Sequence, residues 1–438
     1  MRGQAEETRR ARAARRGGRA AVALALATAL ALSGCGLTGG GKGKVTLSLV
    51  AADYDVSGGQ SSRAYWSSLV AAFEAKHPDI RVEVRIEPWT RVDREVASMV
   101  DKGEAPDIAQ IGSYADYADR GEIYKADELL SVPVQSNFLA PLIQAGEQRR
   151  IHYGLPFVAS TRLLFYNKRL FAEAGIDKPP ATWKELKEAA ELLKEETDAT
   201  YPFALPLGPE EAQAELMNWL LSGGTEGYVE PGGSYAIDSE ENIATVRWLK
   251  TNLVDAGLTG PGVPGVLDRK QAFAAFTRGE VGMLNGHPSL IKQATKAGID
   301  LGTVAIPGRT GKPRAAMGVA DWIMGFKENG NRAEIGEFLN FLFADENVLA
   351  FAAQNDLLPV TVSASESMRT SPAHRKLRVF LDELPTSRLP PVGKTSWTAV
   401  SEDIKKSVGA AMAPGSDPEK VLKTIAARAE SAEAQEEE

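Results

Sequence analysis

The sequence predicts an α/β protein with a mostly parallel sheet that is covered by helices. Two observations predict this fold class: apolar strand-like segments alternate with amphipathic helical segments, and residues 45–111 follow the order strand, helix, strand, helix, strand. This order favours a parallel sheet whose crossover connections are right-handed. Ligands bind such sheets beyond the carboxyl ends of the strands, so a binding site is expected just after them.

The elements of this first segment follow from the spacing of its apolar residues. Residues 45–50 form a short apolar run, residues 80–86 alternate between apolar and charged side chains, and residues 107–111 form a third apolar segment. Such segments are typical of strands. Between them, apolar residues recur every three or four positions over 66–73 and over 92–100, which predicts two amphipathic helices.

The later part of the chain shows the same kinds of element. The sequence Thr-Trp-Lys-Glu at 182–185 is a capping box and predicts the start of a helix. The apolar spacing of 335–342 predicts another helix. Residues 223–233 and 257–265 are rich in Gly and Pro and are expected to be loops. Residues 426–438 contain mainly Ala and Glu without an apolar face, so we expect a disordered tail.

The N-terminal 34 residues have the composition of a secretory signal peptide. Seven arginines lie within residues 1–19, and the twelve residues 20–31 are small or apolar. A bilayer span needs about 20 apolar residues, so the pattern indicates a cleaved signal rather than a membrane helix. The Leu-Ser-Gly-Cys that follows resembles the lipobox of bacterial lipoproteins, which implies that Cys35 is acylated and becomes the mature N-terminus. We therefore expect an exported protein, anchored by lipid to the outer face of the cell membrane, with residues 35–44 as a flexible tether.

The charge of the mature chain disfavours nucleic-acid binding, and its length is sufficient for two domains. The signal peptide carries seven Arg and two Glu, a net of +5, so its removal changes the net charge from −8 to −8 − 5 = −13. An acidic surface disfavours nucleic acid, whose phosphates need Lys and Arg. The remaining 438 − 34 = 404 residues suffice for two domains. We expect a monomer with no metal and no other cofactor.

No catalytic signature stands out in the sequence. A Gly-x-Ser-x-Gly elbow and a His-Glu-x-x-His zinc motif are both absent, and the four histidines are scattered. Residues 36–42 superficially match a phosphate loop, but they lack the next Ser or Thr and the flanking strand and helix. We therefore expect that the protein is not an enzyme; an exported glycosidase that uses two carboxylates is the alternative.

Several segments, taken in order along the mature chain, carry a family resemblance. They are residues 73–82, 105–108, 153–168, 171–176, 180–186, 276–286, 338–342 and 358–360. Together with the lipobox, they resemble the extracellular solute-binding proteins of ABC importers, in the carbohydrate class that includes the relatives of maltose-binding protein. The resemblance covers essentially the whole mature chain.

The resemblance implies a type II periplasmic-binding-protein fold with two α/β lobes and a hinge that the chain crosses more than once. The first lobe is expected to comprise residues 45–158 plus 314–361, and the second residues 159–313 plus 362–425. A carbohydrate would bind in the cleft between the lobes, which close over it and then dock on a membrane permease. A polyamine, a metal or a phosphate ester remains an alternative ligand, and a sensory sugar-binding lipoprotein is an alternative role.

Sugars present hydroxyl groups and apolar ring faces, so their sites combine aromatic and polar side chains. At the first strand end, Asp53 and Tyr54 match the family's contact position. Asp53 also begins a sequence like a calcium-binding loop, which lacks its closing glutamate. Trp89 follows the second strand and matches a common family tryptophan, with interlobe packing as its alternative role. Ser113 and Tyr114 follow the third strand, where the family often contacts its ligand.

Four further candidates lie in the expected second lobe or in the segment that leads into it. Phe157, Ser160 and Arg162 belong to the segment that enters this lobe. Many relatives have an acidic residue in place of Ser160, so no carboxylate clamp is expected there, and Arg162 is alternatively a structural ion-pair partner. His287 stands where relatives usually reach the cleft, although many of them have an aromatic residue nearby.

The last candidates are Asp321, Trp322 and Trp397. The first two lie where the chain is expected to re-enter the first lobe, and Trp397 matches a segment that supplies a lid aromatic in relatives. On that interpretation, replacing Trp397 with alanine weakens sugar binding and leaves the fold intact. Trp219 lies in an apolar helical run, so we expect it to pack in the core.

Overall fold

The computed structural model describes residues 44–54, 61–198, 201–311 and 315–437. The predicted signal peptide, Cys35 and nearly all of the predicted tether lie outside the described residues. Within the described part of the chain, no helix combines the length and the apolar character that a membrane span requires.

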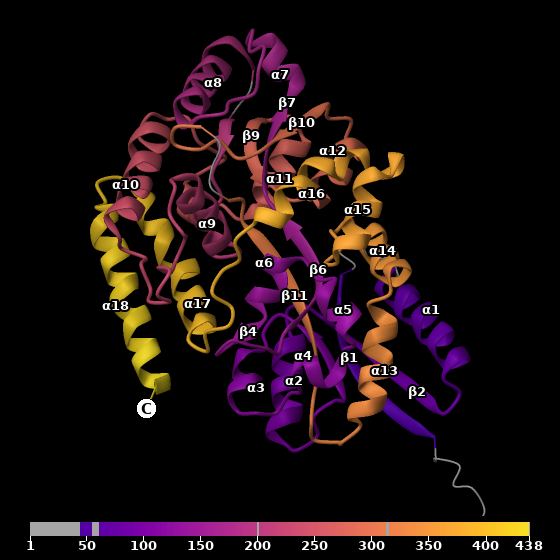
Figure 1. Ribbon diagram of the computed structural model, residues 1–438. Coiled ribbons are helices and arrows are strands. Elements are labelled where there is room, and N and C mark those ends of the chain that lie inside the picture. Colours follow the sequence, from indigo (N-terminus) through magenta and orange to yellow (C-terminus); the bar gives the residue numbers. More distant parts are fainter. Residues whose placement is uncertain (1–43, 55–60, 199–200, 312–314, 438) are drawn as a thin grey trace, which may run out of the picture. The chain divides into compact units, whose positions relative to one another are not determined.

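The first sheet contains the three predicted strands and two strands from later in the chain. Its order is β2 (Ile80–Pro88), β1 (Val45–Asp53), β3 (Ile108–Ile111), β11 (Gly318–Gly325) and β6 (Leu155–Thr161). Strand β1 pairs in parallel with β2 and β3, which confirms the predicted parallel arrangement. Strand β11 runs antiparallel between β3 and β6, so the sheet is mixed at that side. We call this sheet and its helices lobe 1 (Figure 1).

The two predicted crossover helices of lobe 1 are present. Helix α1 spans Ser61–Lys76, and α2 spans Val92–Asp101. Gly103 follows α2 with a φ of 70°, a left-handed conformation that ends a helix at low cost for glycine. Helix α13 (Arg332–Leu342), predicted from its apolar spacing, packs on β1. The remaining α-helices of this part of the chain are α3 (Ala115–Asp119), α4 (Ala126–Leu129), α5 (Val132–Ser136), α6 (Ala140–Ala145), α14 (Asp345–Gln354), α15 (Val362–Thr370) and α16 (Arg378–Glu383).

The second sheet has the order β10 (Leu301–Val304), β7 (Leu163–Asn167), β9 (Val281–Gly286) and β8 (Tyr201–Ala204). Strand β7 is antiparallel to β9 and β10, and β8 is parallel to β9. We call this sheet and its helices lobe 2. Its helices are α7 (Lys168–Glu173), α8 (Trp183–Glu196), α9 (Ala212–Ser222), α10 (Glu240–Leu249), α11 (Arg269–Thr277), α12 (Ser289–Lys296), α17 (Trp397–Ser407) and α18 (Pro418–Glu437).

Short elements complete the description. A small hairpin consists of β4 (Glu147–Gln148) and β5 (Ile151–His152), and a π-helical turn at Lys250–Val254 continues α10. Single 3-10 turns lie at Pro264–Val266, Pro372–Leu377, Leu384–Thr386 and Val408–Met412.

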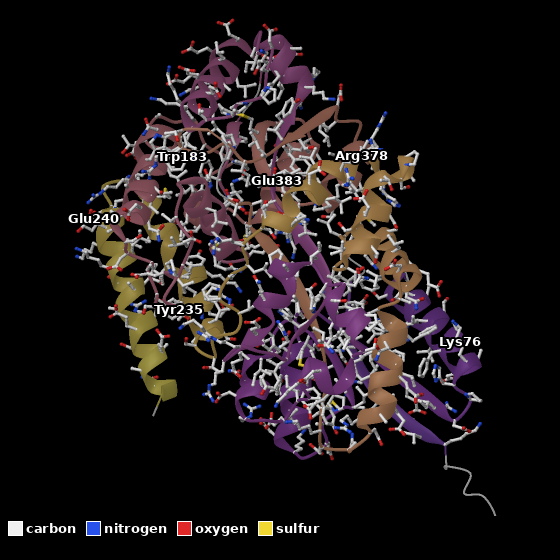
Figure 2. All side chains as sticks on the ribbon, in the orientation of Figure 1. Lys76, Trp183, Tyr235, Glu240, Arg378 and Glu383 are labelled. Carbon is white, nitrogen blue, oxygen red and sulfur yellow. The ribbon has the colours of Figure 1, made fainter. Side chains whose placement is uncertain are left out.

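Helix α8 begins with the predicted capping box. The Glu185 amide donates to Thr182 Oγ1 over 3.2 Å, and the Glu185 carboxylate accepts from the Thr182 amide over 3.0 Å. The ring of Trp183, which is labelled in Figure 2, has its centroid 6.2 Å from that of Trp219 on α9 and 4.7 Å from that of Trp248 on α10. Trp219 is fully buried, which confirms the prediction that it belongs to the core.

The C-terminal segment differs from the predicted disordered tail. Helix α18 continues to Glu437 and packs against α17. Ala426 and Ala429 are buried within the lobe 2 core. Alanine and glutamate are strong helix formers, and the small alanine side chains provide the packing face that a search for large apolar residues does not detect.

A single residue separates the two sheets along the chain. Strand β6 ends at Thr161 and β7 begins at Leu163, so Arg162 links lobe 1 to lobe 2. The chain returns between β10 and β11, where the Thr161 hydroxyl donates to the Met317 carbonyl oxygen over 2.8 Å. The Gly318 amide in turn donates to the Arg388 carbonyl oxygen over 2.8 Å. Separate chain segments therefore lie side by side at the link, as the predicted hinge requires.

Candidate functional site

The candidate site begins at one edge of the lobe 1 sheet. Strands β1, β2, β3 and β6 all run in the same direction, so their carboxyl ends share this edge. Because β11 runs the opposite way, its first half reaches the same edge. A β-bulge separates Asp321 from Trp322 there and changes the direction of the side chains that follow it.

Tyr54 connects the polar groups of this edge. Its hydroxyl donates to Asp321 Oδ2 over 2.8 Å and accepts from Gln110 Nε2 over 2.8 Å. Its ring makes edge contacts with Trp89 at 5.3 Å and with Phe351 at 5.0 Å. Burial, reinforced by the charge of Asp321, raises the pKa of Tyr54 well above its ordinary value, so the hydroxyl stays protonated. Trp89 remains half-buried, which leaves part of its ring surface open.

Two carboxyl groups lie beside this aromatic corner. Asp93 Oδ1 accepts from the Gly112 amide over 3.0 Å, and burial raises the pKa of Asp93. Burial also raises the pKa of Asp321 to about 6; the Tyr54 hydrogen bond and the charge of Arg162 oppose this rise, and the charge of Asp93 adds to it. Both carboxylates therefore have acceptor capacity for a ligand that donates hydrogen bonds.

Arg162 begins the facing part of the site in lobe 2. It is buried, and its Nη2 donates to Glu211 Oε1 over 2.6 Å while its Nη1 donates to Ser160 Oγ over 3.1 Å. Arg269, at the start of α11, also pairs with Glu211 and contacts Glu210 over 2.8 Å. Burial alone would raise the pKa of Glu211, but the two guanidinium groups lower it to about 2. Glu211 therefore stays ionised and neutralises part of their charge.

His287 follows the end of β9 and lies against the same cluster. Its Nε2 is 3.2 Å from Arg269 Nη1, and its Nδ1 is 3.0 Å from Ser289 Oγ. Burial, together with the charges of Arg162 and Arg269, lowers the pKa of His287 to about 3, although Glu211 opposes the shift. The imidazole is therefore neutral at ordinary pH and can accept a hydrogen bond.

These lobe 2 residues line a small pocket. Its lining is Arg162, Pro206, Glu211, Ala214, Glu215, Asn218, Arg269, Phe273, Asn285, Gly286 and His287. The pocket leaves about 10 Å³ for the centre of a water molecule, which is roughly what one water needs. It is therefore a fitted recess beside the link between the lobes rather than a cavity that could hold a whole ligand.

Glu215 is a buried carboxyl group in this pocket, and its pKa is raised. It lies on α9, is 6% exposed, and accepts hydrogen bonds at Oε1 from Trp219 Nε1 over 2.8 Å and from Asn285 Nδ2 over 2.9 Å. Burial raises its pKa to about 7, although these hydrogen bonds oppose the rise. Among the described residues, the Glu215 carboxyl has hydrogen bonds from Asn218, Trp219 and Asn285, and none of these side chains carries a positive charge.

Glu215→Gln should make the stability of the protein less dependent on pH. The folded state holds the Glu215 proton up to pH about 7, whereas the unfolded chain releases it near pH 4.5, so wild-type stability falls as pH rises through this window. The shift corresponds to roughly 3 kcal/mol. The free energy of unfolding, measured with urea at pH 4.5 and at pH 8, should therefore fall by about this much in the wild type and should not show this fall in the variant. Glu280→Gln, at an exposed carboxylate paired with Arg278, is the control and should show the same fall as the wild type; a control that also lacks the fall would contradict the assignment.

The structure brings eight of the predicted site residues to the two edges that meet at the link. They are Asp53, Tyr54, Trp89, Ser113, Ser160, Arg162, His287 and Asp321. Arg162 also forms an ion pair with Glu211, which was the alternative role expected for it. The charge of Arg162 acts on Asp321, which places the two lobes' polar groups within electrostatic reach of each other.

Four predicted contacts lie in the core instead, and we remove them from the candidate site. Tyr114 is fully buried and its hydroxyl donates to the Ala145 carbonyl oxygen over 2.6 Å. Phe157 stacks on Trp66 at 5.5 Å. Trp322 and Trp397 are buried, the first against Tyr114 and the second against Tyr228. A position at a strand end thus does not ensure that a large ring points outward.

Sequence reasoning missed several polar residues of the site: Asp93, Gln110, Glu210, Glu211, Glu215, Asn218, Arg269 and Asn285. A usable signal existed for some of them. Gln110 interrupts the buried strand β3, and Glu215 and Asn218 interrupt the apolar helix α9. Polar side chains that face a core need a partner there, so such interruptions indicate a functional or structural polar cluster.

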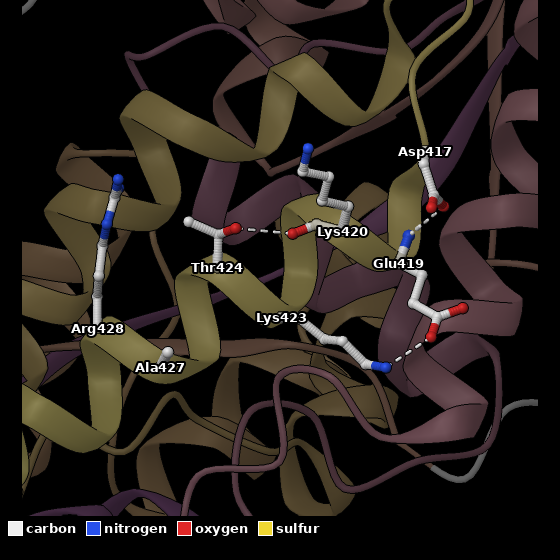
Figure 3. Close-up of a pocket in the computed structure, with 7 residues that line it drawn as sticks. All are labelled: Asp417, Glu419, Lys420, Lys423, Thr424, Ala427 and Arg428. Atoms are coloured by element: carbon white, nitrogen blue, oxygen red, sulfur yellow. Dashed lines mark hydrogen bonds and ion pairs between the residues drawn. The ribbon is translucent and has the colours of Figure 1, made fainter.

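A different hollow, over helix α18, has the wrong chemistry for a ligand site. It is lined by Asp417, Glu419, Lys420, Lys423, Thr424, Ala427 and Arg428 (Figure 3). Several of its charged groups are already paired: Lys423 with Glu419 over 2.6 Å, and Arg428 with Asp403 of α17 over 2.8 Å. We interpret it as the solvated face of one helix. Among the described residues, no group of three or more His, Cys, Asp or Glu side chains could hold a metal ion.

Comparison with known proteins identifies the family. The sequence profile of the bacterial extracellular solute-binding proteins matches residues 58–348, which is more than half of the chain. The chain belongs to this family. Such proteins bind a solute outside the cell and interact with an ABC permease, so the chain is an exported transport protein, and its family and fold are not those of enzymes.

The chain is similar to two binding proteins of Brucella and to a sugar-binding protein of known structure. A protein of Brucella abortus described as a binding protein is 28% identical over 88% of this chain and 92% of its own. An sn-glycerol-3-phosphate-binding periplasmic protein of Brucella melitensis is 26% identical over 50% of this chain and 52% of its own. The crystal structure of a cyclic alpha-maltosyl-1,6-maltose binding protein from Arthrobacter globiformis superposes with a TM-score of 0.75, at 20% identity over 90% of this chain and 99% of its own. This last similarity shows the two-lobed fold.

Proposed function

We propose that the protein captures a carbohydrate between its lobes and delivers it to an ABC permease by hinge closure. The observation that carries this proposal is the aromatic corner of Tyr54 and Trp89 beside the carboxylates of Asp93 and Asp321. An open aromatic ring provides a platform for the apolar face of a sugar, and carboxylates accept hydrogen bonds from its hydroxyl groups. Relatives that are named for sugar ligands support the same class.

A phosphate ester is the second candidate, because one relative is named for glycerol 3-phosphate. Arg162 and Arg269 are the cations that would bind it. Both guanidinium groups already pair with Glu211, and Arg269 pairs with Glu210 as well. The carboxylates of lobe 1 would also repel an anion. These charges favour a neutral ligand, and we place the sugar before the phosphate ester.

The proposal extends to the motion and to the location of the protein. Arg162 and the paired segments beside it form the hinge between lobe 1 and lobe 2, so the first boundary between the lobes lies at Arg162 instead of after residue 158. Closure would bring the lobe 2 cluster over a sugar held at lobe 1. A lipid anchor at Cys35 would keep the protein near its permease; mass spectrometry of the N-terminal peptide, with or without acyl chains, checks this.

A thermal-shift screen of the full-length protein tests the proposed ligand class. Mono- and oligosaccharides, glycerol 3-phosphate and polyamines are the probes, and ligand binding to the folded state raises the melting temperature. We expect a sugar to do so. Trp89→Ala should then weaken binding of that sugar by about 10- to 100-fold. Trp248→Ala, at another half-buried tryptophan, which packs against Trp183 and not beside Tyr54, should not. A shift with glycerol 3-phosphate or a polyamine alone would overturn the sugar assignment.

A further inference from the structure

The small pocket in lobe 2 contains two amide oxygens that lack hydrogen-bond partners. Asn218 and Asn285 are 3% and 4% exposed, and in the described part of the chain neither Oδ1 atom accepts a hydrogen bond. Native structures rarely leave buried acceptors unpaired, so such groups indicate a donor that comes from outside the chain.

The orientation of the Asn285 amide follows from its neighbours. Its Nδ2 donates to Glu215 Oε1 over 2.9 Å, so its Oδ1 is the free acceptor. Both asparagines and Glu215 line the same pocket, from helix α9 and from the end of strand β9. These acceptors therefore belong to a single recess rather than to separate sites in the core.

The charges around the recess select a neutral donor. An added cation would meet Arg162 and Arg269, and an added anion would meet Glu211, which stays ionised. A hydroxyl group carries no charge and donates one hydrogen bond. The space of about 10 Å³ for an oxygen centre also matches one hydroxyl group or one water.

We propose that this recess is a specificity subsite that receives one hydroxyl group of the bound sugar, which donates its one hydrogen bond to the free amide oxygens of Asn218 and Asn285 as a shared, three-centre bond. The inference rests on the proposed function, because it requires that a sugar reaches the recess when the lobes close. It adds to that function a requirement for one particular hydroxyl group. A sugar that lacks this hydroxyl leaves the buried acceptors unpaired and is rejected.

Deoxyfluoro sugars test the subsite directly, because fluorine fills the place of a hydroxyl group but donates no hydrogen bond. The parent probe is whichever of D-glucose, D-galactose and D-mannose raises the melting temperature of the full-length protein most. Its monodeoxyfluoro analogues are then compared by calorimetry. We expect at least one analogue to bind about 10- to 100-fold more weakly than the parent sugar. Analogues that all bind within about threefold of one another would overturn the subsite.

A substitution within the recess separates this effect from other contacts. Asn218→Leu removes an acceptor at similar volume and should reduce the discrimination against that analogue to within about threefold. Asn252→Leu, at a half-buried asparagine of the same lobe outside the recess, should retain the wild-type discrimination. If Asn218→Leu does not fold, Asn218→Ala takes its place in the comparison. If none of the three parent sugars raises the melting temperature, the subsite as proposed is overturned. If a parent sugar binds and all of its analogues bind equally well, the subsite is overturned but the proposed function stands.

Discussion

Trp397→Ala is expected to lower the free energy of unfolding by about 3–5 kcal/mol, the usual loss when a buried tryptophan is truncated. Trp397 is 8% exposed, opens helix α17 and packs at 5.3 Å from Tyr228 within the lobe 2 core. The hydroxyl group of the adjacent Ser396 lies 3.0 Å from the hydroxyl group of Tyr235. The cavity left by the ring would be surrounded by packed side chains that can relax only in part.

Urea unfolding of wild type and variant measures this effect, and sugar calorimetry is the second readout. Trp397→Phe, which retains an aromatic ring, should recover much of the stability. The resemblance to sugar-binding relatives predicts the opposite pair of results, with weak binding and an intact fold. A stability loss below about 1 kcal/mol, together with a lost affinity, would return Trp397 to the binding site.

Trp397 was expected to contact the ligand but is buried in the core, whereas other features of the fold were predicted correctly from local sequence patterns. The order of β1, α1, β2, α2 and β3 follows from apolar spacing, since each of these elements forms over a short stretch of chain. The capping box at Thr182 is similarly local. These features were predictable because the residues that determine them are neighbours in sequence.

The site depends on residues that are distant in sequence. Tyr54 and Asp321 are 267 positions apart, yet their side chains form one hydrogen bond. Arg162 and Glu211 are 49 positions apart. The pattern around each residue can indicate that it follows a strand, but it does not specify which side chain from elsewhere lies opposite.

Burial of aromatic residues is not local either. Tyr114 and Trp322 lie next to strand ends, as ligand contacts often do, but they pack on each other at 5.1 Å inside lobe 1. Trp89, also at a strand end, stays half-buried beside Tyr54. The difference between these tryptophans arises from the neighbours that tertiary structure supplies, so a single sequence predicts the positions better than the exposure.

Arg162→Ala is expected to lower the free energy of unfolding by about 3–5 kcal/mol at pH 7, because it leaves one partner of a buried ion pair without its cation. Arg162 is 7% exposed and contacts Glu211 over 2.6 Å. Arg269 remains beside Glu211 and places the expected loss toward the lower end of this range. Arg428→Ala, which breaks an exposed pair with Asp403, is the control and should cost less than about 1 kcal/mol.

The pH dependence of this loss distinguishes the ion pair from simple packing. The folded pKa of Glu211 is about 2, below the unfolded value near 4.5, so the stability that the pair contributes is present above pH 4.5 and is lost as pH falls toward 2. The destabilisation by Arg162→Ala should therefore be smaller at pH 3 than at pH 7. An unchanged difference between the two pH values would show that Arg162 stabilises the folded state mainly by packing rather than by its charge.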